Sequence, residues 1–189
     1  MKIETSRFGT VEIGESEVIE FRNPILGFDQ FRRFVLLRHA GNEKGSQKEE
    51  AHEGEKGAGK DAAPLSFYWL QSLEDGTLAF LVIPAVAIKP DYLPLIPEGD
   101  LDLLDIKSEE EVVLLSLATV RPDPLRITAN LRAPLVINAH RRLACQSILE
   151  DDNYPIRYEI QASDPNQKPA DKKETAGLDQ LALPVKPCC

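Results

Sequence analysis

Histidine and cysteine are the residues of this chain best suited to bind a metal or to act as a nucleophile with its base. They are His39, His52, His140, Cys145, Cys188 and Cys189. No pair has HxxH, HxxxH or CxxC spacing, so no structural or catalytic zinc site is expected. His140 and Cys145 could form a base and a nucleophile, but no third residue that would orient them is evident. Cys145 lies in an apolar run typical of a small core residue, and we predict no catalytic residue, metal or cofactor.

Carboxylates are the other candidates for chemistry, and they are concentrated in one part of the chain. Residues 62–120 contain ten acidic but only two basic residues, in a chain whose net charge is −9. Asp100, Asp102, Asp105 and the run Glu109–Glu111 more often form a solvated surface than an acid and base pair. Such a surface either keeps the protein soluble or forms a localised acidic face, which could dock a basic partner.

Composition and charge exclude other classes of function. A general nucleic-acid binder needs a basic face that displaces counterions, so direct binding of DNA or RNA is not expected. No window of the sequence approaches the roughly 20 apolar residues of a membrane span, and the N-terminal stretch lacks the apolar region of a signal peptide. We therefore expect a cytoplasmic protein.

Short apolar runs bounded by turn residues predict about eight or more strands and almost no long helix. Residues 10–21 are expected to form a hairpin, and Asp29 to cap a short helical turn. Ser108 with Glu109–Glu111 resembles the first turn of a helix placed just before a strand. The strongest strand runs are 34–37, 66–73, 78–83, 112–120, 133–139 and 154–160. This pattern favours an all-β sandwich or small barrel.

We predict that residues 1–160 form a single domain. Two segments, one inserted in this domain and one after it, differ from it in composition. Residues 41–63 lack apolar periodicity and aromatic residues, so they are expected to be a disordered insert, either a regulatory loop or a lineage-specific addition. Residues 161–189 are rich in proline and polar residues, and are expected to be a flexible C-terminal tail. The tail either folds against a partner or is an ordinary disordered terminus.

The segment Thr119–Asn138 is specific in sequence but contains no catalytic pattern. Its proline, asparagine and arginine residues lie between apolar runs, which favours recognition by surface and backbone. Asn130 and Asn138 either contact a partner or hydrogen-bond the backbone in turns. Trp69 and Phe80 are expected in the core, because large aromatic side chains dominate buried area.

These motifs together resemble the flagellar assembly factor FliW family. The matching residues are Leu26–Phe28, Trp69–Leu73, Leu78–Phe80, Pro90–Tyr92, Asp123–Pro124, Thr128, Asn130–Leu131, Ala133–Pro134 and Val136–Asn138. The resemblance covers about residues 1–160. The chain departs from it in the 41–63 insert, in the tail and at Pro24–Phe28, where the family has Gly-Leu-Pro-Gly-Phe.

The resemblance implies a small antiparallel β-barrel-like domain with few short helices and no enzymatic activity. It also implies binding to flagellin and, when flagellin has been exported, to the translational regulator CsrA, whose repression of flagellin translation is thereby relieved. The alternatives are a flagellin chaperone without a link to CsrA, or a small-molecule-binding barrel.

Partner-binding residues are predicted from the acidic region and from the motif segments. They are Asp91, Tyr92, Asp100, Asp102, Asp105, Asn130, Leu131, Pro134 and Asn138. We expect the acidic region to contact CsrA, and the segment from Asn130 to Asn138 to form either a partner surface or the closure of the barrel.

Overall fold

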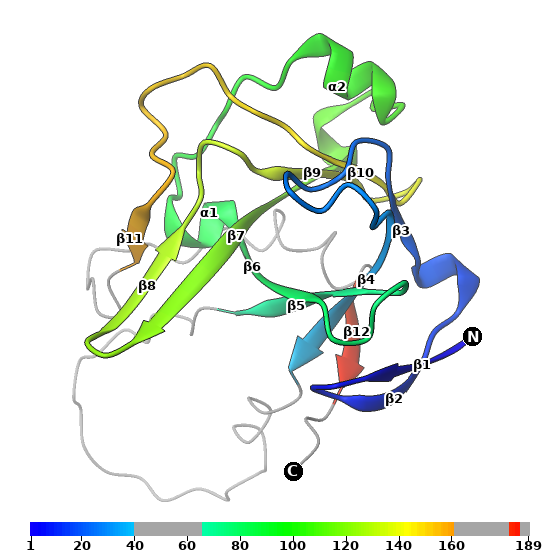
Figure 1. The fold of residues 1–189 in the computed structure, drawn as a ribbon. Coiled ribbons are helices and arrows are strands. Elements are labelled where there is room, and N and C mark those ends of the chain that lie inside the picture. Colours follow the sequence, from blue (N-terminus) through cyan, green and yellow to red (C-terminus); the bar gives the residue numbers. More distant parts are fainter. Residues whose placement is uncertain (40–65, 161–181, 186–189) are drawn as a thin grey trace, which may run out of the picture.

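The computed structural model describes residues 1–39, 66–160 and 182–185 of the chain, with the backbone alone at His39 and at 182–185 (Figure 1). The predicted insert, His52, Cys188, Cys189 and most of the predicted tail lie outside the described residues. The strands are β1 (Lys2–Thr5), β2 (Gly9–Glu12), β3 (Ile19–Phe21), β4 (Arg33–His39), β5 (Tyr68–Ser72), β6 (Ala79–Pro84), β7 (Val112–Pro122), β8 (Leu125–Ala129), β9 (Leu135–Asn138), β10 (Leu143–Gln146), β11 (Tyr158–Ile160) and β12 (Ala182–Val185). The helices among the described residues are short: α1 (Ala85–Ile88), α2 (Glu98–Leu103) and the 3-10 turns Glu15–Glu17 and Glu109–Glu111.

Seven of the strands close into a barrel. Its order is β7, β6, β5, β4, β3, β10 and β9, and β9 pairs back to β7. The pairs in the barrel are antiparallel except β3 with β10. These two strands run parallel, and Glu20 and Phe21 pair with the distant Leu143 and Ala144. The prediction of an all-β, barrel-like fold with few short helices is confirmed, with this one parallel junction as an addition to it.

Large apolar side chains fill the inside of the barrel. One buried cluster joins residues from every barrel strand, among them Phe21, Phe34, Leu70, Leu115 and Ile137. The rings of Phe21 and Phe34 meet edge to face at 5.0 Å. Phe80 packs against this cluster, as predicted for a core residue. A barrel of this size is filled by its own inward-facing side chains, so the interior is a packed core and not a binding cavity.

Strand β4 shows why the sequence contains nearly continuous apolar runs. Phe34 and Leu36 point into the barrel, whereas Val35 and Leu37 point outward beneath the β1–β2 hairpin. Trp69 packs partly buried in this outer cluster, and the guanidinium of Arg7 lies 4.3 Å from the centre of its ring. A strand covered on both faces must be apolar at every position.

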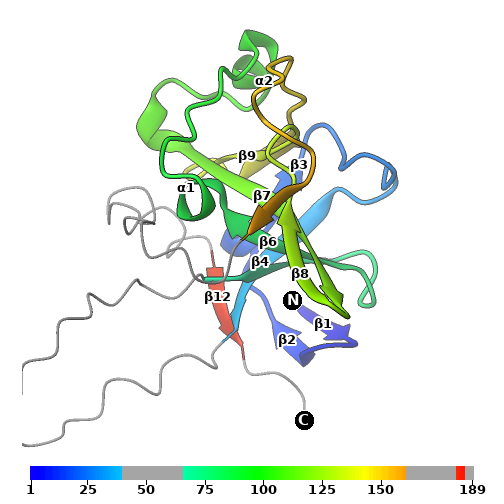
Figure 2. The same ribbon diagram turned by 90° about the vertical axis from the view of Figure 1, so that its left-hand side faces the viewer.

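The long strand β7 belongs to two sheets. Its first half pairs with β6 and β9 in the barrel, and Ala118–Pro122 leave the barrel to pair with β8, which in turn pairs with β11 (Figure 2). The sequence-based interpretation missed β8 and predicted no strand between the runs 112–120 and 133–139. That interpretation was wrong because residues 119–126 are exposed, and polar residues and prolines interrupt their sequence, so they lack the apolar run by which the core strands were found.

Several local predictions need correction. The N-terminal hairpin is formed by β1 and β2, not within 10–21, and Asp29 lies in a turn without a helix. The strand expected at 154–160 begins only at Tyr158. Ala182–Val185, assigned to the tail, form β12 and pair in parallel with β4. By contrast, the turn at Glu109–Glu111 followed by β7, and the β5–β6 hairpin, are as predicted.

Candidate protein-binding site

The predicted site residues Tyr92 and Leu131 are both buried, and they hold two distant segments together. The Tyr92 hydroxyl donates a 2.7 Å hydrogen bond to the backbone carbonyl oxygen of Leu131. The Tyr92 ring also meets that of Tyr154 edge to face at 4.7 Å. Burial raises the pKa of Tyr92 far above the usual range of a tyrosine. The tyrosine therefore stays neutral and anchors the loop that follows it.

Residues 90–97, which we call the leucine loop, expose two apolar side chains just after this anchor. Leu93 is 82% exposed and Leu95 is 92% exposed. Ile96 is partly buried and packs against the clusters on both sides of the loop. The loop is held at Tyr92 and at Ile96, and prolines at 90, 94 and 97 restrict its backbone further. The two leucines are thus exposed on a loop with restricted backbone freedom, which lowers the entropy that a partner would have to offset on binding.

Sequence reasoning missed Leu93 and Leu95. Apolar residues were expected in the core, whereas Leu93 and Leu95 are at the surface. The signal that could have found them is the interruption of apolar residues by proline in the segment Leu93-Pro94-Leu95-Ile96-Pro97, which has neither strand nor helix periodicity.

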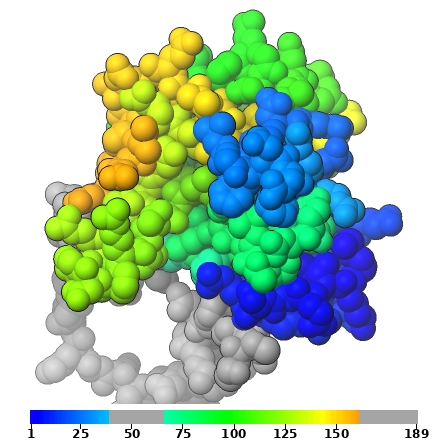
Figure 3. Space-filling view, in the orientation of Figure 1, coloured from blue at the N-terminus to red at the C-terminus, as the bar shows by residue number. Residues whose placement is uncertain are grey.

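Helix α2 follows the leucine loop and is fixed to the barrel beneath it. Leu104 is fully buried against Val136 and Cys145. The Asn138 side-chain amide donates hydrogen bonds of 3.0 and 3.2 Å to the backbone carbonyls of Leu104 and Asp105. These contacts place α2 at one end of the molecule, shown at the top of Figure 3.

The three predicted aspartates of this region differ in their surroundings. The Ser147 hydroxyl donates a 2.5 Å hydrogen bond to Asp100, which ties that carboxylate to the chain after β10. Asp105 forms ion pairs with Lys107 at 2.6 Å and Arg141 at 2.8 Å. The hydrogen bond and charge of Lys107, with the charge of Arg141, hold the pKa of Asp105 below its usual value. Asp102 is exposed, and within the described residues it forms no ion pair.

Two further acidic side chains lie at the ends of the leucine loop. Asp91 is largely exposed and pairs with Lys89 at 2.6 Å, and Glu98 is exposed at the start of α2. With Asp102 they place negative charge before and after the exposed leucines. We call Asp91, Leu93, Leu95, Glu98 and Asp102 the acidic leucine patch.

The remaining predicted contact residues have structural roles that follow from their positions. The Asn138 side chain is 1% exposed and accepts hydrogen bonds from the backbone amides of His140 and Arg141. The Asn130 side chain accepts hydrogen bonds from the amides of Arg132 and Ala133. Pro134 is buried just before β9. Of the two alternatives for the asparagines, these contacts match the turn role, and the buried Leu131, Pro134 and Asn138 offer no surface to a partner.

Cys145 and His140 do not form a catalytic pair. Cys145 is fully buried in β10, and burial, with a smaller effect from Asp100, raises the pKa of its thiol to about 12. His140 is exposed in the turn after β9. Across residues 1–39 and 66–160, histidine, cysteine and acidic side chains form no group that could hold a metal ion. No described helix is long and apolar enough to cross a membrane.

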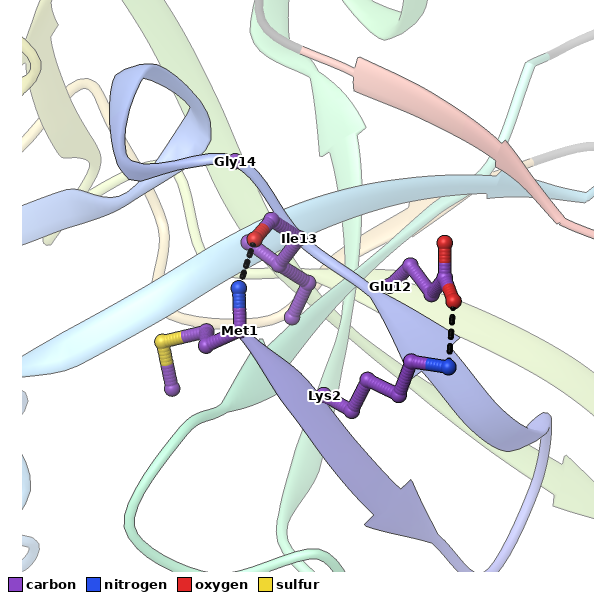
Figure 4. A pocket seen from close by; sticks show the side chains of 5 residues that line it. All are labelled: Met1, Lys2, Glu12, Ile13 and Gly14. Carbon is purple, nitrogen blue, oxygen red and sulfur yellow. Dashed lines mark hydrogen bonds and ion pairs between the residues drawn. The ribbon is translucent and has the colours of Figure 1, made fainter.

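Described residues outside the barrel interior line two hollows at the surface. One, of about 420 Å³, is open and lies between the start of β1 and the end of β2 (Figure 4). There the N-terminal amino group of Met1 donates a hydrogen bond to the carbonyl oxygen of Ile13, and Lys2 forms an ion pair with Glu12. The other, of about 440 Å³, lies on the sheet formed by β7, β8 and β11.

Comparison with known proteins places this barrel in a family. The model of the FliW protein family matches residues 2–47 and 58–160, and the gap between these two ranges lies within the predicted insert. A flagellar assembly factor FliW of Syntrophus aciditrophicus is 40% identical over 160 residues, covering 85% of this chain and 87% of its own length. That of Bdellovibrio bacteriovorus is 33% identical over 184 residues, covering 95% and 93%.

A solved structure agrees with these relatives. The crystal structure of a flagellar assembly factor FliW superposes with a TM-score of 0.66 at 31% identity, and the match covers 85% of this chain and 96% of that one. The family model covers well over half of the chain, and the relatives match along most of their own length. This chain therefore belongs to the FliW family of flagellar assembly factors.

Proposed function

We propose that this protein is a non-enzymatic regulator in the cytoplasm that binds flagellin and, when free, the RNA-binding translational regulator CsrA. Flagellin holds the protein while flagellin is abundant. Export of flagellin frees the protein, which then binds CsrA and relieves its repression of flagellin translation. Membership of a family of flagellar assembly factors supports a role in this process.

The observation that carries the proposal is the acidic leucine patch. Leu93 and Leu95 are the most exposed large apolar residues among those described, and the chain holds them on a stiff loop rather than burying them. Interfaces commonly have a small apolar centre surrounded by polar residues. The exposed carboxylates of Asp91, Glu98 and Asp102 complement a partner with a basic surface, as a protein that binds RNA must have.

Charge in this patch favours the rate of encounter, and the leucines favour the lifetime of the complex. Exposed charges act mainly by steering and are weakened by salt, whereas buried apolar anchors slow dissociation. Substitution of the leucines is therefore expected to weaken binding at every salt concentration, whereas reversal of a charge is expected to weaken it chiefly at low salt.

Titration calorimetry with purified CsrA tests the patch. Replacing both leucines (Leu93→Ala, Leu95→Ala) should weaken binding at least about tenfold at every salt concentration, since a lost anchor costs more than about 1 kcal/mol. Leu26→Ala is the matched control, because Leu26 is an exposed leucine elsewhere on the barrel. Asp102→Lys should weaken binding chiefly at low salt, with the exposed Asp29→Lys as its control. Unchanged affinity in both patch variants would contradict the proposed site.

Pull-down from lysate with and without flagellin separates the alternatives. Capture of CsrA only when flagellin is absent supports the switch. Capture of flagellin with no CsrA under either condition would instead indicate a flagellin chaperone without the regulatory link. The small-molecule barrel has less support, because apolar side chains from all seven barrel strands fill the interior.

A further inference from the structure

The hollow on β7, β8 and β11 is a basic groove in an acidic protein. Its floor is one face of the three-stranded sheet, in which Thr119 pairs with Thr128 and Thr128 with Glu159. The opposite face, including Ala118, Ile127 and Ile160, packs on the buried cluster around Tyr92. Three exposed arginines, Arg121, Arg126 and Arg157, line the groove face.

The positions of these arginines are not explained by the stability of the fold. Arg121 and Arg126 lie directly opposite each other on β7 and β8, and like charges in this position destabilise a strand pair. Glu159 pairs only with Arg126 among the described residues, at 3.6 Å with both side chains exposed. Within the same part of the chain, neither Arg121 nor Arg157 has an acidic partner. An unfavourable cross-strand pair of arginines beside a groove is what an anionic ligand would relieve.

Apolar and polar groups in the groove indicate what kind of anion fits. Leu117 and Ile156 contribute apolar surface, and the two threonines offer hydroxyl groups along the floor. Glu159 and the net charge of −9 oppose any anion, and they oppose a long polyanion such as RNA, with a charge on every unit, more than a short segment with few charges. A peptide with carboxylates spaced between apolar side chains meets all of these groups.

We propose that this groove is a second docking surface, which takes an extended acidic segment of a partner protein. It lies on the opposite face of this sheet from Tyr92, after which the exposed residues of the leucine loop follow. In Figure 3 the β7–β8 hairpin lies at the lower left with β11 above it, and α2 lies at the top. The two surfaces have opposite charge and select different partners, so the protein can recognise two kinds of protein through unrelated contacts.

The test is NMR titration of the full-length protein with an acetylated, amidated heptapeptide of alternating glutamate and valine. The expected result is saturable shifts of the backbone amides of Thr119, Thr128 and Glu159. Arg121→Glu should weaken binding at least about tenfold. Because it replaces the like-charged pair by an opposite one, it should also fold at least as well as the parent, as judged by Tm. Arg157→Glu should weaken binding as well, whereas the exposed Arg22→Glu, outside the groove, should not.

Three results would overturn the proposal. One is the absence of saturable shifts. Another is equal binding of a lysine–valine peptide, which would remove the role of the arginines. The third is an equal or stronger response to inorganic phosphate or a short single-stranded RNA, which would make the groove an anion or nucleic-acid site. Variants of the acidic leucine patch should leave peptide binding unchanged, so the two surfaces are tested independently.

Discussion

The hydrogen bond from the Tyr92 hydroxyl to the Leu131 carbonyl joins residues 39 positions apart, in two segments that both carry family motifs. Neither group is available to a partner. The bond instead fixes the start of the leucine loop against the segment between β8 and β9. The motif residues thus support the proposed binding surface, whose exposed leucines, Leu93 and Leu95, follow Tyr92 in the chain.

Removal of that bond should destabilise the fold. Tyr92→Phe keeps the ring packed against Tyr154 but leaves the buried Leu131 carbonyl without its partner. The expected loss is about 1 to 2 kcal/mol of unfolding free energy, measured by urea denaturation. Tyr158→Phe is the control, because the Tyr158 hydroxyl has no hydrogen bond among the described residues. Equal effects of the two substitutions would show that the bond contributes nothing specific.

The turn between β5 and β6 requires glycine for a reason of packing. A Cβ atom added at Gly76 would clash with the backbone carbonyl oxygen of Glu4 in β1. Gly76→Ala should therefore destabilise the protein by about 1 to 3 kcal/mol through overpacking. Gly99→Ala in α2, where a Cβ meets nothing within 4 Å, should be neutral or stabilising by up to about 1 kcal/mol. Thermal unfolding measures the Tm of both variants. A lower Tm for Gly99→Ala than for Gly76→Ala would contradict this prediction.

Asp105 should make stability depend on pH in the acid range. Its folded pKa is lowered by Lys107 and Arg141, so its contribution is complete above the usual pKa of about 3.9 and is lost as pH falls through the lower folded value. Asp105→Asn tolerates the positive φ of 52° at this position and removes the charge. Urea unfolding at a series of pH values should show the variant less stable than the parent at neutral pH, with the gap closing on acidification.

A second background checks the cause of this effect. When Lys107 and Arg141 are both replaced with alanine, the carboxylate of Asp105 has no cation beside it. In that background, Asp105→Asn should change the free energy of unfolding at neutral pH much less than it does in the parent protein. The ion pairs would not be the cause if Asp105→Asn reduced the free energy of unfolding as much in this background as in the parent protein, or if its effect grew at low pH.

Cys145 should be unreactive while the protein is folded. Its thiol is buried and its pKa is raised to about 12, so almost no thiolate is present near neutral pH. In a variant with Cys188 and Cys189 replaced by serine, Cys145 is the single thiol, and a disulfide reagent near neutral pH should label it only after urea is added. Rapid labelling without urea would show that β10 opens readily or that the thiol is accessible.

The local pattern of apolar residues was sufficient to predict the strands that are covered by the core. Residues 34–37 and the hairpin around Asp75 and Gly76 follow from it, because burial on one or both faces imposes a short-range periodicity. The same pattern predicted Cys145 as a core residue. The acidic region could also be identified from the sequence, since the distribution of charged residues along the chain is read directly from it.

Strand pairing between distant segments, and the exposure of individual side chains, were decided by long-range packing and could not be predicted from these local patterns. The parallel pairing of β3 with β10 joins residues far apart in the chain, and β8 lies outside the barrel on a sheet with one solvated face. Asp100 and Asp105 are held by Ser147 and Arg141, whereas Leu93 and Leu95 are left exposed. Residue type indicates what a side chain can do, but its exposure and its partners depend on segments brought together by the closed barrel.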